Sequence, residues 1–128
     1  MNLLLDTCTF LWMLDEVERL GPNARPALED GRNRVVLHQV SSWEIQLKHD
    51  RGKLPLPLPP AQLIPEAVER LDLAYQPLLD EDIWFLGKLP ALHADPFDRI
   101  LLSHALGQGR KLVTPDPQIA RYPVPVVW

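Results

Sequence analysis

Four acids in the sequence stand at positions from which their carboxylates could act together: Asp6, Glu44, Asp98 and Asp116. Carboxylates gathered in one pocket repel one another, or force one of them to stay protonated, unless a cation compensates their charge. Without His or Cys partners they favour hard cations, and Mg²⁺ or Mn²⁺ held by a few acids is the usual arrangement for phosphate chemistry. Such an ion activates a bound water and stabilises a leaving oxygen. The acids therefore predict metal-dependent cleavage of a phosphodiester bond.

Local structure could explain Glu44 but not Asp6. Residues 41–44 read Ser-Ser-Trp-Glu, which fits a capping box in which Glu44 reaches back to the backbone of Ser41. That interpretation needs no metal, so both roles of Glu44 stay open. Asp6 follows an apolar run that we expect to be buried, and the sequence shows no capping role for it. This position favours a functional role for Asp6.

The remaining acids lie next to prolines at predicted helix starts. Asp95 precedes Pro96 and Asp116 precedes Pro117, so both are candidate helix N-caps. Asp98 would be a favourable charge in the first turn of the helix that Asp95 opens. Capping is the preferred interpretation of Asp95, whereas for Asp116 capping and a site role stay open.

Apolar runs and helical patterns alternate along the chain and predict the elements that position these acids. We expect strands at 2–5, 35–38, 71–75, 111–114 and 124–127, and helices at 7–14, 22–29, 41–51, 61–70, 80–89 and 95–107. Pro65 could mark a later start of the fourth helix. Alternation with few hairpin signals predicts the α/β class, with a mostly parallel sheet flanked by helices on both faces. Asp6, Glu44 and Asp116 would then share the carboxyl edge of the sheet, where ligands bind, and Asp98 could join them.

The composition is that of an ordinary globular protein, with 128 residues, 46% hydrophobic and 23% charged. We expect one domain, residues 1–128, without a signal peptide or a membrane span. Cys8 is the only cysteine, which excludes an internal disulfide and favours the reducing cytoplasm. A net charge of −4 excludes nucleic-acid binding through one broad basic face, so any such contact must be local.

Other kinds of site have less support in the sequence. The four histidines show no metal-ligand spacing with acids or Cys8, so we expect hydrogen-bonded structural residues. No serine lies in a G-x-S-x-G context, and the glycines near Lys111 lack P-loop spacing. The four tryptophans are scattered, which favours packing in a core or an interface over base stacking.

Four segments, in this order, resemble the motifs of PIN domains. They are Leu-Leu-Leu-Asp-Thr at 3–7, Ser-Ser-Trp-Glu-Ile at 41–45, His-Ala-Asp-Pro-Phe-Asp-Arg-Ile-Leu-Leu at 93–102 and Val-Thr-Pro-Asp at 113–116. The resemblance covers essentially the whole chain and is closest to the VapC-like toxins of type II toxin–antitoxin pairs. It implies an endoribonuclease that uses Mg²⁺ or Mn²⁺ to hydrolyse RNA, with Asp6, Glu44, Asp98 and Asp116 as metal-binding and catalytic acids.

The resemblance also implies roles for neighbouring residues and partners. Thr7 and Thr114 match hydroxyl positions that could orient acids or waters, and Asp95 is a candidate helper or cap. Candidate RNA contacts are Arg99, Lys48, Arg51 and Lys53, although Arg99 could instead pair with an acid and the other three could form a solvated helix face. The resemblance further implies a homodimer, and a cognate antitoxin protein that binds it and blocks its activity.

Three other functions compete with the toxin hypothesis. A PIN-type nuclease in RNA maturation or decay would lack an antitoxin, and an adjacent antitoxin gene would distinguish the two. A receiver-like Mg²⁺-binding module needs an acid after the third strand, and residues 71–77 offer none there. An inactive binding domain loses support because all four acids are present.

Overall fold

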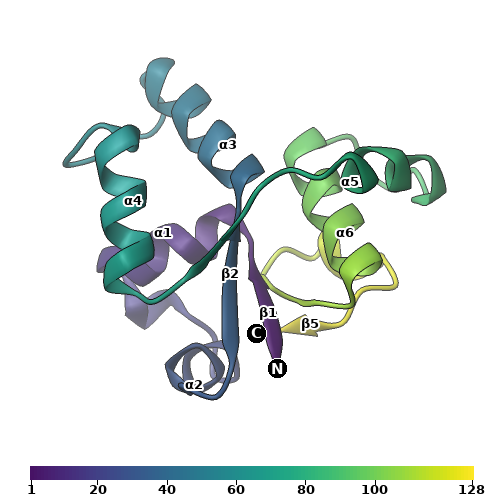
Figure 1. The fold of residues 1–128 in the computed structure, drawn as a ribbon, viewed down its shortest axis with the longest axis horizontal. Coiled ribbons are helices and arrows are strands. Elements are labelled where there is room, and N and C mark those ends of the chain that lie inside the picture. The colour runs from purple at the N-terminus through teal and green to yellow at the C-terminus, as the bar shows by residue number, and fades with distance from the viewer.

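The computed structural model describes residues 1–128 and contains one five-stranded sheet (Figure 1). The strands are β1 (Asn2–Leu5), β2 (Arg34–His38), β3 (Ala74–Gln76), β4 (Lys111–Val113) and β5 (Val126–Val127). Their order is β3-β2-β1-β4-β5, and every neighbouring pair is parallel. The predicted α/β class with a parallel sheet is confirmed.

Six α-helices connect and cover the strands: α1 (Thr7–Asp15), α2 (Ala24–Glu29), α3 (Gln39–Asp50), α4 (Pro60–Arg70), α5 (Asp80–Trp84) and α6 (Pro96–Gln108). Short 3-10 helices lie at Val17–Arg19, Phe85–Lys88 and Ile119–Arg121. No helix combines the length and the apolar character that crossing a membrane requires.

Alternate residues of the strands point to two separate cores, one on each face of the sheet. Leu3 and Leu5 pack with side chains of α1, α2 and α4, whereas Leu4 packs with side chains of α6 and of the chain after β4. The helix α3 contributes to both cores, through Ile45 on one face and Val40 on the other. Successive strand residues face opposite sides, so a strand buried on both faces is continuously apolar. This explains the unbroken Leu3–Leu5 run.

The strand order creates a switch point beside β1, because the chain adds β2 and β3 on one side of β1 and β4 and β5 on the other. Ligands in such sheets bind beyond the carboxyl ends of the strands at the switch point. The chain leaves that edge at Asp6 after β1 and at Thr114 after β4. The Asp6 N–H donates to the Val113 carbonyl at 3.3 Å, which holds the two strand ends together.

Several predicted boundaries shift in the structure. The third strand lies at Ala74–Gln76 rather than 71–75, and α3 begins at Gln39, two residues before the predicted start. Its N-cap is His38, whose Nδ1 accepts a hydrogen bond from the Val40 N–H at 2.9 Å. The proposed late start at Pro65 is wrong, because α4 begins at Pro60 and contains Pro65 in its interior.

Candidate active site

Asp6 lies at the end of β1 and is also the N-cap of α1, a role that the sequence did not reveal. Its carboxylate accepts from the Thr9 N–H at 2.8 Å and from the Thr114 hydroxyl. The side chain is buried, and this burial raises the pKa of Asp6 although the bonds from Thr114 and Thr9 oppose the shift. The carboxylate is therefore held in place but only partly compensated.

Glu44 lies in the second turn of α3 and does not form the predicted capping box, because Ser41 is already inside the helix. Its Oε1 accepts from the Thr7 hydroxyl at 2.6 Å, and its Oε2 accepts from the Lys48 ammonium one helical turn later. Thr7 and Thr114, which we expected near site acids, therefore each donate a hydrogen bond to one of these acids.

Asp98, in the first turn of α6, lies among the other acids. Burial, and then the charges of Asp95, Asp116 and Glu44, raise the pKa of Asp98 to about 6. His93 opposes this shift, because its Nε2 lies 3.2 Å from Asp98 Oδ2. Charges act on one another only over short distances in water. Glu44, Asp95, Asp98 and Asp116 therefore lie close together in space.

Asp95 and Asp116 both accept backbone hydrogen bonds, but only Asp95 is the helix N-cap that the sequence predicted. Asp95 is the N-cap of α6, with its Oδ1 accepting from Phe97 N at 2.9 Å and Asp98 N at 3.0 Å. Asp116 Oδ1 accepts from Gln118 N at 2.8 Å, in a turn before the 3-10 helix Ile119–Arg121. The second oxygen of each carboxylate accepts no hydrogen bond, so these backbone contacts are compatible with a site role.

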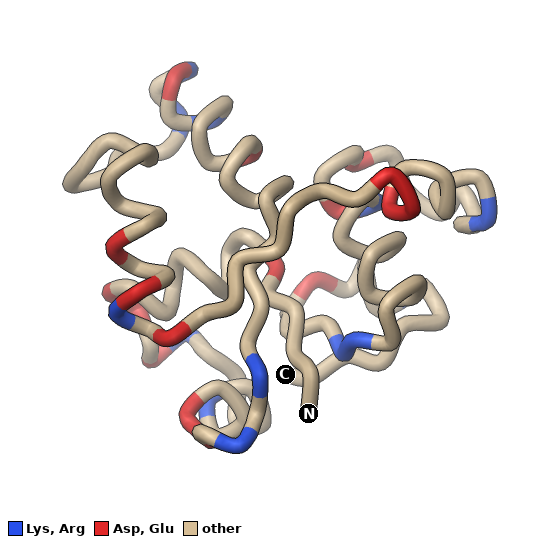
Figure 2. The backbone as a smooth tube through the Cα atoms, viewed as in Figure 1, with Lys and Arg blue, Asp and Glu red and all other residues tan.

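The proposed basic residues contribute little positive charge near the acids. Lys48 is the exception: burial works against its charge, but the hydrogen bond to Glu44 and the nearby Asp95 and Asp98 hold the pKa of Lys48 above its usual value. Arg99 meets no acid, because its guanidinium donates to the Pro90 carbonyl and the Tyr122 hydroxyl. Arg51 and Lys53 are exposed beyond the end of α3. Figure 2 shows basic positions spread over separate parts of the molecule.

Cys8 completes the surroundings of Asp6. Its thiol donates to the Asp6 carboxylate, with Sγ 3.4 Å from Oδ1. Burial and the charge of Asp6 raise the pKa of the Cys8 thiol to about 12, so it is a protonated donor. The sequence gave no sign of this contact beyond the spacing of two residues.

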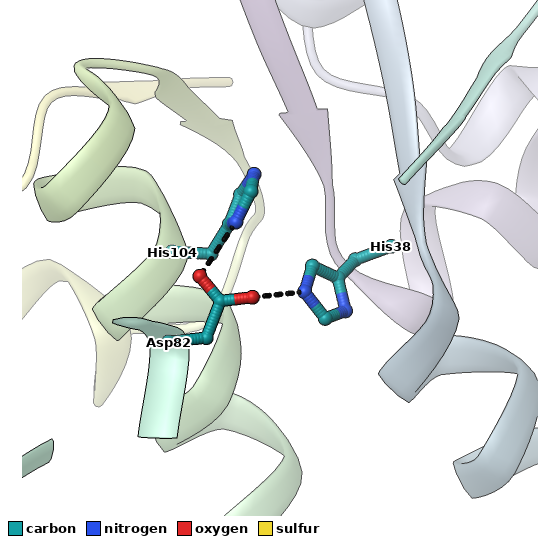
Figure 3. A group of neighbouring side chains, drawn as sticks. All are labelled: His38, Asp82 and His104. Atoms are coloured by element: carbon teal, nitrogen blue, oxygen red, sulfur yellow. Dashed lines mark hydrogen bonds and ion pairs between the residues drawn. The ribbon is translucent and has the colours of Figure 1, made fainter. Parts of the chain in front are cut away.

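A second group of titratable side chains, which the sequence did not predict, is buried between β2, α5 and α6 (Figure 3). His38 Nε2 lies 2.9 Å from Asp82 Oδ2, and His104 Nδ1 lies 2.8 Å from Asp82 Oδ1. All three side chains are at most 1% exposed. His38, Asp82 and His104 are the only three His, Cys, Asp or Glu residues whose potential metal-ligand atoms all lie within 4.8 Å of one another.

The hydrogen bonds around this group specify how each imidazole is protonated. His38 Nδ1 accepts from the Val40 N–H, and His104 Nε2 accepts from the Arg110 guanidinium at 3.1 Å. The proton of each neutral ring therefore lies on the nitrogen that faces Asp82. Burial lowers the pKa of His38, which keeps that ring neutral. To bind a metal ion here, each ring would have to move its proton to its other nitrogen. That nitrogen already accepts a hydrogen bond, so two donors would then face each other. The group is therefore a closed hydrogen-bond network.

The acid site has the opposite property, because the charges of other acids act on Asp98, and Lys48 supplies the one ammonium that is hydrogen-bonded to an acid there. Its donor set is all oxygen, which suits Mg²⁺ or Mn²⁺. The acids form no group with ligand atoms within 4.8 Å, and Mg²⁺ typically keeps several waters and contacts only one or two carboxylates directly. The residues present therefore fit a hydrated divalent ion.

Comparison with known proteins gives one family. A family model described as PIN domain matches residues 3–125. Ribonuclease VapC16 of Mycobacterium tuberculosis (strain ATCC 25618 / H37Rv) is 39% identical over 46 residues, which make up 36% of this chain and 33% of that protein. The chain thus matches about a third of the length of this curated relative.

Solved structures share the fold at low sequence identity. VapBC2 from Rickettsia felis, bound to a DNA fragment from its promoter, aligns over 98% of this chain and 97% of its own, with a TM-score of 0.72 and 16% identity. DNA-bound VapBC from Salmonella typhimurium aligns over 98% and 96%, with a TM-score of 0.69 and 14% identity. At these identities the likeness shows a common fold.

Proposed function

Because the chain belongs to the PIN domain family, we propose that it is a metal-dependent endoribonuclease that hydrolyses RNA and serves as the toxin of a type II toxin–antitoxin pair. The observation that carries the proposal is the group of acids around Asp98, where burial and then the charges of these acids raise the pKa of the Asp98 carboxyl to about 6. Such a perturbed acid among other acids at a sheet edge is characteristic of a functional site. The ribonuclease relative and the fold shared with VapBC structures support the same activity.

We assign Asp6, Glu44, Asp98 and Asp116 as the residues that would hold Mg²⁺ or Mn²⁺. When bound, the ion would activate a water and stabilise the leaving oxygen of the phosphodiester. The chain's own residues orient the acids: Thr114 and Thr9 hold Asp6, and Thr7 and Lys48 hold the two oxygens of Glu44. His93 meets Asp98, and Asp95 orders the first turn that carries Asp98.

The proposed partners follow from the relatives. The two solved structures described above are VapBC assemblies bound to DNA, which supports a cognate antitoxin for this chain. We also propose a homodimer, and a cytoplasmic location that suits both an RNA substrate and the single protonated thiol of Cys8.

The first test is cleavage of total cellular RNA by the purified protein with Mg²⁺, with Mn²⁺ and with EDTA. We expect metal-dependent cutting that falls by more than about 100-fold in Asp6→Asn and in Asp98→Asn, since even the partners of metal ligands contribute 10- to 100-fold. Both variants should keep the melting temperature of the parent, because each removes a charge from a repelling group. Glu81→Gln, an exposed acid on α5, is the matched control and should cut normally.

Full activity in both site variants would refute the proposed site, and cutting that persists in EDTA would refute metal dependence. If the protein cuts RNA but no adjacent gene encodes an antitoxin that inhibits it, the toxin assignment is wrong and a role in RNA maturation or decay replaces it.

A further inference from the structure

Trp43 and Phe97 form an aromatic pair between two helices that carry site acids. Trp43 lies on α3 and Phe97 on α6, with ring centroids 5.1 Å apart and ring planes at 80°. This edge-to-face arrangement is a favourable geometry for two aromatic rings. The pair therefore connects α3 to α6 across the space between them.

Each ring directly precedes an acid of the site in the sequence, Trp43 before Glu44 and Phe97 before Asp98. Glu44 is 6% exposed, whereas Trp43 is 60% exposed although it is the adjacent residue on α3. We expected the tryptophans to pack in a core or an interface, and a core position is wrong for Trp43. Phe97 is half-buried and packs against the core on the α6 side of the sheet. Phe97 thus supports one edge of the Trp43 indole while most of that side chain remains open to solvent.

Few positive charges lie near the site to attract the phosphates of RNA, so its affinity for RNA needs another source. The chain carries a net charge of −4, its basic residues do not gather on one face, and Lys48 is bound to Glu44 (Figure 2). Proteins that bind single strands combine backbone electrostatics with stacking of bases on aromatic rings, and one stacked base contributes about 1–3 kcal/mol. Stacking needs no positive charge and works with any base. The exposed indole of Trp43, which contacts Phe97 in the first turn of α6 that also carries Asp98, meets this requirement.

We propose that the exposed indole of Trp43, supported by Phe97, is a subsite on which an unpaired base of the RNA stacks next to the phosphate that is cut. The inference rests on the proposed nuclease function and adds a residue that binds the substrate of that activity. A paired base inside a duplex cannot present its face to Trp43, so duplex RNA binds weakly at this subsite.

The test measures binding apart from cleavage, with Asp98→Asn as the background so that the RNA stays intact. The probe is a fluorescein-labelled 12-nucleotide single-stranded RNA of mixed sequence, titrated in Mg²⁺ and followed by anisotropy. Adding Trp43→Ala should weaken binding by about 5- to 150-fold, the equivalent of one stacked base. Trp43→Phe should recover most of the affinity, because it keeps an aromatic face. In the active protein, Trp43→Ala should raise KM far more than it lowers kcat.

Trp84→Ala is the matched control, because Trp84 is 71% exposed on α5 but has no site acid next to it in the sequence. It should bind the probe as the background protein does. Annealing the probe to its complement should abolish the difference between Trp43→Ala and the background.

Equal affinity with Trp43 and with Ala at this position overturns the proposal, as does an absence of measurable binding by the background protein. A drop in oligomeric mass on Trp43→Ala, measured by sedimentation, would show that the ring belongs to an interface between copies of the chain and would also overturn it. These results are separate from the cleavage test: a protein that cuts RNA but ignores Trp43→Ala keeps its function and loses only the subsite.

Discussion

Asp98 and Asp82 are two acids on neighbouring helices, but their surroundings move their pKa values in opposite directions. Burial and the charges of other acids raise the pKa of Asp98 to about 6. Burial by itself would raise the pKa of Asp82 as well. Hydrogen bonds from His38, the Leu79 N–H and His104 outweigh that effect and hold the pKa of Asp82 below its usual value. The difference lies in the neighbours, which are carboxylates in one case and N–H donors in the other.

The comparison shows how the surroundings of one residue type decide whether its oxygens are paired within the fold or left without partners. The network of His38, Asp82 and His104 has a donor for each acceptor and joins the start of α3 to α5 and α6. Such a network favours one arrangement of the elements that it joins, because any other would leave buried polar groups unpaired. The acid site instead keeps unpaired carboxylate oxygens that a cation can occupy. We infer that the network helps to hold α3 and α6, with Glu44 and Asp98, at a constant spacing.

The largest expected effect on stability comes from Asp82→Asn. The Asn amide would place its NH₂ group against a histidine N–H, so two donors would face each other. It would also remove the negative charge that stabilises the positive charge of Arg110. The free energy of unfolding should therefore fall by about 3 kcal/mol. Urea denaturation followed by circular dichroism measures this. Asp98→Asn and the exposed Glu81→Gln serve as controls and should lose little or nothing. A stability of Asp82→Asn equal to that of Glu81→Gln would contradict a closed network.

Thr114→Val tests whether the acid site depends on its hydroxyl partners. The change keeps the shape of the side chain but removes the donor to Asp6, so Mn²⁺ affinity measured by electron paramagnetic resonance should fall by about 10- to 100-fold. Ser103→Ala is the control, because the buried Ser103 hydroxyl donates to the backbone carbonyl of Asp82 and contacts no acid of the site. If both variants bind Mn²⁺ equally well, the Thr114 contact has no part in metal binding.

The smallest expected effect is a pH dependence of stability in metal-free protein. Because the folded-state pKa of Asp98 is raised to about 6, the folded protein binds more protons than the unfolded chain between about pH 4 and 6. Asp98 should therefore add about 1 kcal/mol of stability as pH falls from 7.5 to 5, relative to Asp98→Asn. Saturating Mg²⁺ should remove the difference, because an ion-bound carboxylate stays ionised.

His38 gives the opposite sign and sharpens the contrast. Burial lowers the pKa of His38, so its contribution to stability is complete above the ordinary histidine pKa and declines as pH falls below it. Thermal melts of Asp98→Asn should thus show falling stability on acidification. A parallel pH profile for the parent and Asp98→Asn would mean that Asp98 is not perturbed.

The sequence predicted well wherever a residue's role depends on its near neighbours in the chain. The apolar run before Asp6 predicted a buried strand, and Asp95 before Pro96 predicted the cap of α6. Alternating strand and helix patterns predicted the parallel sheet, since parallel strands need long crossovers. The family motifs predicted the PIN domain match. Errors at this level were small shifts of boundaries, such as the early start of α3 at His38 and Gln39.

The sequence by itself therefore determined the family and the class of fold, and it predicted the acids of the candidate site. Only the tertiary structure decided which partner each polar side chain takes. Glu44 accepts a hydrogen bond from Thr7, 37 residues away, and not from the backbone of Ser41, three residues before it. Asp82 pairs with His38, 44 residues away, although it follows two exposed acids in its own helix. The physical reason is that helix and strand patterns depend on residues within a turn or two, whereas burial and pairing depend on which elements pack together. That packing leaves Trp43 in solvent and places Asp82 in the interior.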